Sequence, residues 1–175
     1  MRKGLIEETD IVLRPAVPGD LPALSRLRGD REAQALLMGH PEARSGDDTA
    51  AWISRRAAAA DGAFFAIADT AACLGFAQLT ARHGLDRHAR FGIALLPEAR
   101  GRNVGFRAMN LLINEARESG LRKLSCEVRA DNGAALKLYR NLGFRDVGVL
   151  RAHYDDSAQV WDVILMEKLL AEHST

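Results

Sequence analysis

The stretch LLPEARGRNVGF at residues 95–106 ends an apolar run at a proline and resumes as a helix beyond a basic turn. Gly101 and Asn103 tolerate left-handed backbone, so successive N–H groups of the turn can point into one concavity. The positive end of the next helix dipole lies there, and Arg100 and Arg102 would complete a phosphate clamp. We therefore expect an anion-binding turn, the alternative being a tight strand-to-helix turn with solvated arginines.

The composition is that of one soluble domain spanning residues 1–175, with 47% apolar and 27% charged residues. No apolar run approaches the roughly 20 residues that a membrane helix needs, and the N-terminus lacks the apolar core of a signal peptide. We expect a cytoplasmic protein without a membrane partner, and residues 1–10 as a loose arm. The net charge of +1 argues against a nucleic-acid partner, because such domains are strongly basic.

The cysteines and histidines show no spacing typical of disulfides or metal sites. Cys73 and Cys126 lie in apolar segments and are expected to be buried thiols. His83, His88 and His153 fall in turn or strand positions without ligand spacing. We therefore expect no metal centre.

Before the basic turn, apolar patterns predict one strand, three helical stretches and three more strands. In chain order these are residues 11–16, the helices carrying Leu21–Leu27, Ala33–Leu37 and Trp52–Ala60, and the strands 63–68, 74–80 and 91–96. Asp20 is expected to cap the first helix, and Asp47 or Asp48 the third. Residues 42–47 are expected to form a loop. Short connections between the last three strands predict an antiparallel meander.

After the turn, one helix has the clearest period, with Gly105, Met109, Leu112, Ile113 and Ala116 on one face. Gly120 is expected to end it. The strand at residues 124–129 alternates apolar and polar side chains, and Asn132 can cap a helix that stops at Gly143.

Two last strands are expected at residues 144–152 and 160–166. The strand–helix–strand order over residues 91–129 implies a parallel pair within an otherwise antiparallel sheet. The predicted fold class is α/β (α+β), with a mixed, mostly antiparallel sheet of about seven strands and flanking helices.

Two motifs resemble the GNAT superfamily of acyl-CoA-dependent N-acetyltransferases. The family pattern (Q/R)-x-x-G-x-(G/A) at a helix start is matched by RGRNVG at residues 100–105, with Asn103 where glycine is usual. An Asn followed by a helix that ends in a Leu-Tyr pair and a Gly-Phe is matched by Asn132, Leu138-Tyr139 and Gly143-Phe144. The pattern at residues 143–151 looks most like the branch of ribosomal-protein, polyamine and sugar-nucleotide amine acetyltransferases.

The resemblance implies a GNAT-like fold that binds acetyl-CoA as cosubstrate, without a metal, between the strand ending at Leu95 and the strand carrying Glu127. Main-chain groups of Leu95 would pair with the pantetheine amide, and N–H groups near Ile93–Leu95 would stabilise the oxyanion. Asn132 would act as a helix cap or as a pantetheine contact. The implied cofactor-binding residues are Leu95, Arg100, Gly101, Arg102, Asn103, Val104, Gly105, Phe106 and Asn132.

The resemblance also implies two catalytic residues. Tyr139 would be the general acid that protonates the CoA thiolate, the alternative being a core tyrosine. Glu127 would be the general base, the alternative being a strand carboxylate paired with Arg129 or Arg122. Asp155 and Asp156 would either line the acceptor site or shape a turn.

The expected function is transfer of an acetyl group from acetyl-CoA to a primary amine of a small molecule or protein N-terminus, by direct attack without an acyl-enzyme. One alternative is a CoA-binding or interaction module without turnover. Another is an RNA-binding module that uses Arg100, Arg102 and Arg107. Acceptor specificity is expected in residues 30–50 and the hairpin at 153–160, and the last strands suit a homodimer.

Overall fold

A computed structural model describes residues 10–39 and 46–170 of the chain. The expected loose arm, apart from Asp10, and the 42–45 part of the expected loop lie outside the described residues. No helix in the described ranges is long and apolar enough to span a membrane.

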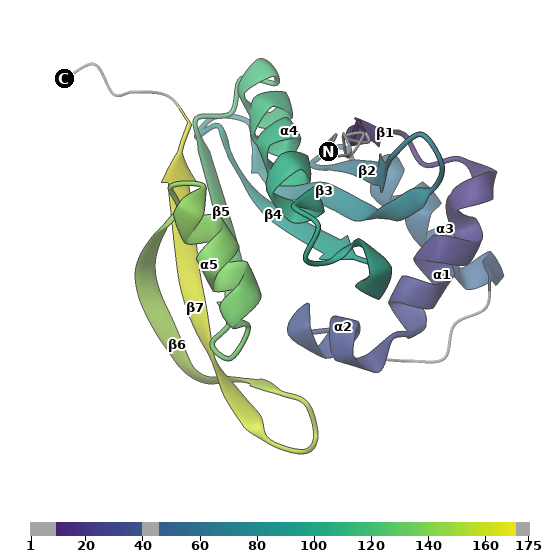
Figure 1. The fold of residues 1–175 in the computed structure, drawn as a ribbon. Helices are drawn as coiled ribbons and strands as arrows, with labels where there is room; N and C mark the ends of the chain where they lie inside the picture. The colour runs from purple at the N-terminus through teal and green to yellow at the C-terminus, as the bar shows by residue number, and fades with distance from the viewer. Residues whose placement is uncertain (1–9, 40–45, 171–175) are drawn as a thin grey trace, which may run out of the picture.

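The described residues form seven strands and five α-helices (Figure 1). In chain order they are β1 (Val12–Arg14), α1 (Leu21–Gly29), α2 (Arg31–Leu36), α3 (Gly46–Ala57), β2 (Ala63–Ala68), β3 (Cys73–His83), β4 (His88–Leu95), α4 (Val104–Glu118), β5 (Lys123–Arg129), α5 (Gly133–Asn141), β6 (Arg145–Asp155) and β7 (Val160–Leu169). Single 3₁₀ turns, η1 (Pro18–Asp20) and η2 (Pro97–Ala99), precede α1 and follow β4.

All seven strands belong to one sheet in the order β1-β2-β3-β4-β5-β7-β6. Every neighbouring pair is antiparallel except β4 and β5, which are parallel and are connected through α4. This confirms the expected meander and the parallel pair. The edge strand β6 leaves Val147 and Val149 about half exposed, at 50% and 53%.

The helices pack in two groups, one against each face of the sheet. The larger core joins α4 and α5 to apolar side chains that include Phe91 and Leu124. The smaller core joins α1, α2 and α3 to Phe64, Phe76 and Ala94 on the other face. Figure 1 shows α4 and α5 side by side, with α1 to α3 gathered away from them.

The periodicity of α4 explains why it lies against the sheet. Met109, Leu112, Ile113 and Ala116 are all buried, as expected, and each large side chain contributes roughly 2 kcal/mol through burial. Gly120 follows the helix with a φ of 80°, a left-handed conformation suited to glycine.

Two helix caps expected from the sequence are wrong. Asp20 precedes α1, but its carboxylate accepts hydrogen bonds from Arg14, at 2.7 and 2.8 Å, and from the Val17 N–H, at 2.8 Å. The buried Asp20 carboxylate therefore binds the partly exposed Arg14 guanidinium and does not cap the helix, and this pair connects β1 to the start of α1. The helix α3 begins at Gly46, so Asp47 and Asp48 lie inside it and not at the residue that precedes it.

Candidate active site

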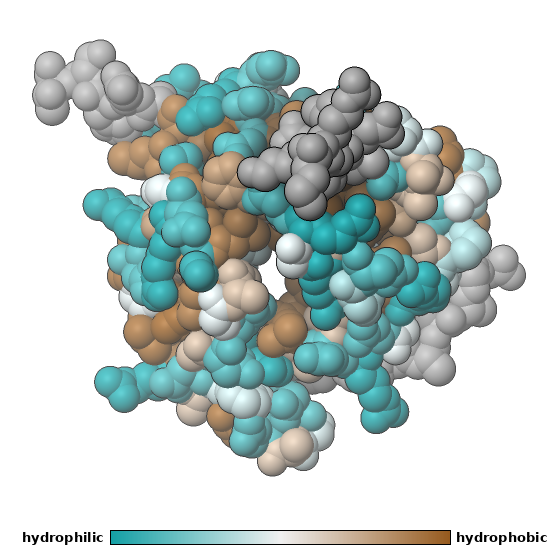
Figure 2. All heavy atoms as spheres, in the orientation of Figure 1, coloured by the Kyte–Doolittle hydropathy of each residue, from teal (hydrophilic) through white to brown (hydrophobic). Residues whose placement is uncertain are grey.

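The strands β4 and β5 pair over only three residues and then separate. His88–Arg90 are in register with Lys123–Ser125, whereas beyond them β4 continues to Leu95 and β5 to Arg129 without pairing with each other. A cleft of about 970 Å³ opens at this separation, and residues from both faces of the sheet line it. Figure 2 shows the molecule hollowed at the centre of the same view. The gap expected between these two strands is therefore present.

The end of β4 pairs with β3 on one edge, and on the other edge its main-chain groups face the cleft. The Leu96 N–H donates to the Leu74 carbonyl on β3, at 2.9 Å, and the Ala94 carbonyl approaches Gly75 so closely that a Cβ there would lie 2.1 Å away. The N–H and C=O groups of successive residues in a strand point to alternate edges. Those of Ile93 and Leu95 therefore point to the edge opposite β3, where β5 has diverged. The Leu95 carbonyl accepts a hydrogen bond from Arg100 Nε, at 3.1 Å. The N–H groups of Ile93 and Leu95 are the main-chain donors of this edge.

The basic turn has the backbone that the sequence predicts. Gly101 has a φ of 71° and Asn103 a φ of 61°, so both are left-handed. Asn103 directly precedes α4, whose first N–H groups have no partner within the helix and point out of its N-terminus. Gly105 allows close packing, because a Cβ there would lie 3.3 Å from Leu138 and 3.5 Å from Leu95.

The two arginines of the turn differ in position. Arg100 lines the cleft and lies 4.0 Å from the Asp30 carboxylate. Arg102 is not among the lining residues, and its Nη1 donates to the Glu98 carbonyl at 3.4 Å. The remaining residues implied for this part of the site, namely Leu95, Gly101, Asn103, Val104, Gly105 and Phe106, all line the cleft.

Tyr139 lies on α5 and reaches the cleft from the face that carries α4. Its ring meets Phe91 edge-on, with centroids 5.1 Å apart, and lies 5.8 Å from Phe144. The side chain is 7% exposed, and this desolvation raises the pKa of Tyr139 above its ordinary value. The phenol therefore stays protonated, and Tyr139 is both a packed core residue and a cleft residue.

Glu127 reaches the cleft from β5 and forms an ion pair with Arg90 of β4. Its side chain is 25% exposed. The alternative partners expected from the sequence are wrong, because Arg122 Nε donates to the Asp86 carbonyl, and Arg129 is engaged at the other end of β5. There Arg129 pairs with Asp131 at 2.6 Å and stacks over Trp161 at 4.3 Å.

Cys126 precedes Glu127 on β5 and faces the side of the sheet that holds Tyr139, because side chains alternate along a strand. The thiol lines the cleft but is 5% exposed, and burial raises the pKa of Cys126 to about 12. A thiol held protonated is a poor nucleophile.

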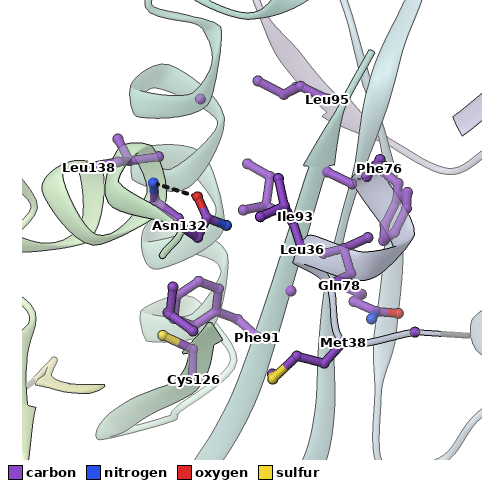
Figure 3. Close-up of a pocket in the computed structure, with 18 of the residues that line it drawn as sticks. Leu36, Met38, Phe76, Gln78, Phe91, Ile93, Leu95, Cys126, Asn132 and Leu138 are labelled. Atoms are coloured by element: carbon purple, nitrogen blue, oxygen red, sulfur yellow. Dashed lines mark hydrogen bonds between the residues drawn. The ribbon is translucent and has the colours of Figure 1, made fainter. Parts of the chain in front are cut away.

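Asn132 serves the helix and the cleft with different atoms. Its Oδ1 accepts the Ala135 N–H at 3.2 Å, which confirms the expected cap of α5. In Figure 3 the other end of the amide points toward Ile93 across the cleft. The two roles expected as alternatives are therefore compatible.

The opposite half of the cleft contains residues that the sequence did not single out. Arg28, Trp52, Gln78 and Arg90 line it, together with the 33–39 segment. A polar Gln78 within the apolar run of β3 is the one signal that marks this surface in the sequence. Residues 30–50 were expected to determine acceptor specificity, and the 33–39 part of that range lines the cleft, where Figure 3 shows Leu36 and Met38 beside Gln78.

The last hairpin shapes a turn and does not line the cleft. Asp155 accepts the Ser157 N–H at 2.8 Å, and Asp156 accepts N–H groups of Ala158 and Gln159 and the Trp161 indole. The turn role of these two aspartates is confirmed. The hairpin still contacts the segment beside the cleft, because the Tyr154 hydroxyl donates to the Gly39 carbonyl at 2.9 Å.

Histidines that look scattered in the sequence meet in space at the β3–β4 turn. Ligand atoms of His83, Asp86 and His88 lie within 4.8 Å of one another, and the two imidazole rings stack at 5.4 Å. The hairpin register brings them together, which linear spacing did not reveal. None of the three lines the cleft.

Comparisons with known sequences point to one family. A family model described as an acetyltransferase (GNAT) domain matches residues 10–145. The ribosomal protein bS18-alanine N-acetyltransferase of Salmonella typhimurium is 37% identical over 82 residues, which are 47% of this chain and 55% of that protein. N-alpha-acetyltransferase RimI of Mycobacterium tuberculosis is 45% identical over 62 residues, 35% of this chain and 37% of that protein. The chain spans about half the length of the curated relatives that it matches.

Solved structures show the same fold. The spermidine N-acetyltransferase of Vibrio cholerae, in complex with CoA and spermine, aligns with a TM-score of 0.85 at 23% identity, over 91% of this chain and 95% of that one. The structure of yncA from Salmonella typhimurium with its cofactor acetyl-CoA aligns with a TM-score of 0.79 at 19% identity, over 94% and 96%. With a family model that matches most of its length, the chain belongs to the GNAT acetyltransferase family.

Proposed function

We propose that this chain transfers the acetyl group of acetyl-CoA to a primary amine. The observation that carries the proposal is the separation of β4 and β5, with the left-handed turn at its end and with Glu127 and Tyr139 directed into it from opposite faces. Membership of the GNAT family, and relatives named as N-acetyltransferases, support the same reaction.

The residues around the cleft fit acetyl-CoA. N–H groups of the turn and the start of α4 suit a diphosphate, with Arg100 beside them. The N–H groups of Ile93 and Leu95 and the Asn132 amide suit the pantetheine amides. When bound, acetyl-CoA supplies a thioester whose carbonyl carbon is the acetyl donor.

The chain's own groups would divide the proton transfers. Glu127 would take a proton from the acceptor ammonium, directly or through water, and the freed amine nitrogen would form the C–N bond to give a tetrahedral intermediate with negative charge on the former carbonyl oxygen. An N–H at the unpaired edge of β4 would stabilise the oxyanion, by about 3 kcal/mol for one such donor. As the C–S bond breaks, Tyr139 would give its proton to the departing sulfur, and the second proton of the nitrogen would pass through water to the phenolate, so that free CoA and an N-acetyl product leave.

The test separates binding from turnover. Calorimetry should show CoA binding that weakens on Arg100→Gln, and a thiol reagent should detect CoA release from acetyl-CoA with primary amines. Glu127→Gln should slow release about 100-fold and change the pH–rate profile, whereas Glu118→Gln, on the exposed side of α4, should match the unmodified protein. CoA binding without release from any amine would instead indicate a binding module.

A further inference from the structure

The cleft has two halves that lie on opposite faces of the sheet. On β3 and β4, Gln78 is in register with Gly92 and Thr80 with Arg90, so these side chains share the face that carries Glu127. The helices α1 to α3 pack on this face, whereas Tyr139 and the turn before α4 belong to the other. The face with Glu127 is the side from which an acceptor amine would approach.

This acceptor half is strongly basic. Arg28, Arg55, Arg56 and Arg90 all line it, and within the described ranges the only carboxylate in the cleft lining is Glu127. Glu127 is already paired with Arg90. Within the described residues, no second carboxylate lines the cleft to balance the charges of Arg55 and Arg56.

The four arginines are not equivalent. Arg28 is 6% exposed, donates to Thr49 Oγ1 at 3.1 Å and lies over the Trp52 ring at 4.6 Å, so it has a packing role. Arg55 and Arg56 lie in the last turn of α3, are exposed, and make no ion pair or hydrogen bond with the described part of the chain. Arg56 also lines a small hollow with Gln78 and Thr80 of β3, where Asp61 is the one carboxylate among the described lining residues.

A second feature of the same surface points to a ligand. Gln78 Oε1 is buried without a hydrogen-bond partner within the described residues. Its amide lies against Gly92, where an added Cβ would be 3.2 Å from Nε2. Gln78 lines the cleft together with Arg56 and Glu127, and a rotation of its side chain would bring this amide oxygen, which has no donor, to an N–H of the acceptor.

We propose that the acceptor is a small zwitterionic amine, whose carboxylate or phosphate binds Arg55 and Arg56 while its amine lies at Glu127. This rests on the acetyltransferase function proposed above. Guanidinium groups suit carboxylates and phosphates because they donate two parallel hydrogen bonds. A polyamine would instead place several positive charges among arginines, which disfavours it.

Matched amine pairs test the preference. Phosphoethanolamine is compared with ethanolamine, and β-alanine with propylamine, with CoA release as the readout and spermidine as the polycation. The member with a carboxylate or phosphate should have a kcat/KM at least tenfold higher than its partner without one, and the ratio should fall as potassium chloride is raised. The pair with the larger ratio identifies phosphate or carboxylate as the recognised group.

Substitutions locate the recognition. Arg55→Gln and Arg56→Gln should raise KM for the anionic amine several-fold, with kcat and the CoA Kd close to those of the unmodified protein. The double change Arg55→Glu and Arg56→Glu should shift the preference toward spermidine. Arg31→Gln is the matched control, because Arg31 is an exposed helical arginine outside the cleft lining.

Three outcomes would overturn the proposal, and they are distinguishable. Equal or better turnover of spermidine, or of amines without a carboxylate or phosphate, by the unmodified protein would refute the zwitterionic acceptor and leave the acetyltransferase function intact. Weaker CoA binding in the Arg55 and Arg56 variants would assign these arginines to the cosubstrate. CoA binding without release from any amine would refute the proposed transferase, and the acceptor with it.

Discussion

Tyr139 combines a buried ring with a hydroxyl at the cleft, so its two roles can be separated by one atom. Tyr139→Phe keeps the contacts with Phe91 and Phe144 and removes the proton. We expect kcat to fall about 100-fold while the melting temperature stays close to that of the unmodified protein. Steady-state kinetics and thermal unfolding check this, and unchanged turnover would leave Tyr139 as a core residue alone.

Asn103 occupies the position where the family pattern has glycine, and its φ of 61° explains why asparagine is accepted. Asn103→Gly should therefore preserve CoA binding. Asn103→Val places a β-branched residue in left-handed backbone, at a cost of about 1–2 kcal/mol, and should weaken CoA binding about tenfold. Calorimetry with CoA measures both variants, and a valine variant that binds as tightly as the unmodified protein would contradict the role of this backbone.

The start of α5 depends on Asn132, and two substitutions distinguish its cap from its cleft contact. Asn132→Asp keeps an oxygen for the Ala135 N–H but loses the amide donor that faces the cleft. Asn132→Ala loses both groups. The aspartate variant should unfold like the unmodified protein yet bind CoA more weakly, and the alanine variant should also lose about 1 kcal/mol of stability. Urea unfolding and calorimetry on the same samples check both effects.

The connection from β1 to α1 depends on an ion pair between the buried Asp20 and the partly exposed Arg14, and this pair gives a pH-dependent stability. Hydrogen bonds from Arg14, with a further one from Val17, hold the pKa of Asp20 below its ordinary value of 3.8. A lowered folded-state pKa means that the pair stabilises fully above pH 3.8 and that this contribution is lost as the pH falls through the folded-state pKa.

Asp20→Asn should therefore lower the free energy of unfolding by about 2 kcal/mol at neutral pH. The difference from the unmodified protein should narrow as the pH falls below the ordinary Asp value. Urea unfolding across this range measures it. A difference that stays constant with pH would show that packing, and not charge, makes Asp20 important.

The sheet as a unit ends at an edge strand that suits self-association. Val147 and Val149 on β6 are each about half exposed, beside main-chain groups that no strand pairs within the described residues. Exposed apolar edges favour pairing with another chain. We expect a homodimer in sedimentation experiments, and we expect Val149→Lys to shift it to monomer. A monomer at all concentrations for the unmodified protein would contradict this interface.

Much of the fold follows from short-range patterns. The alternation in β5, the apolar face of α4 and the Asn132 cap each depend on residues within a few positions, so they are legible in the sequence. The cap predicted for Asp20 was wrong because its partner, Arg14, lies in another element of the fold. A short-range rule favoured the helix N–H groups, whereas Arg14 offered two charged donors once β1 and α1 were adjacent.

The backbone conformation of residues 95–106 follows from their own sequence, because Gly101 and Asn103 adopt the left-handed conformation and a helix begins directly after them. The cleft beside it depends on where β4 and β5 stop pairing, which is a property of the assembled sheet. The same holds for the Arg90–Glu127 pair and for the arginines of α3 that face it. Periodicity acts through neighbours in the chain, whereas charges brought together from different elements are set by strand register and packing.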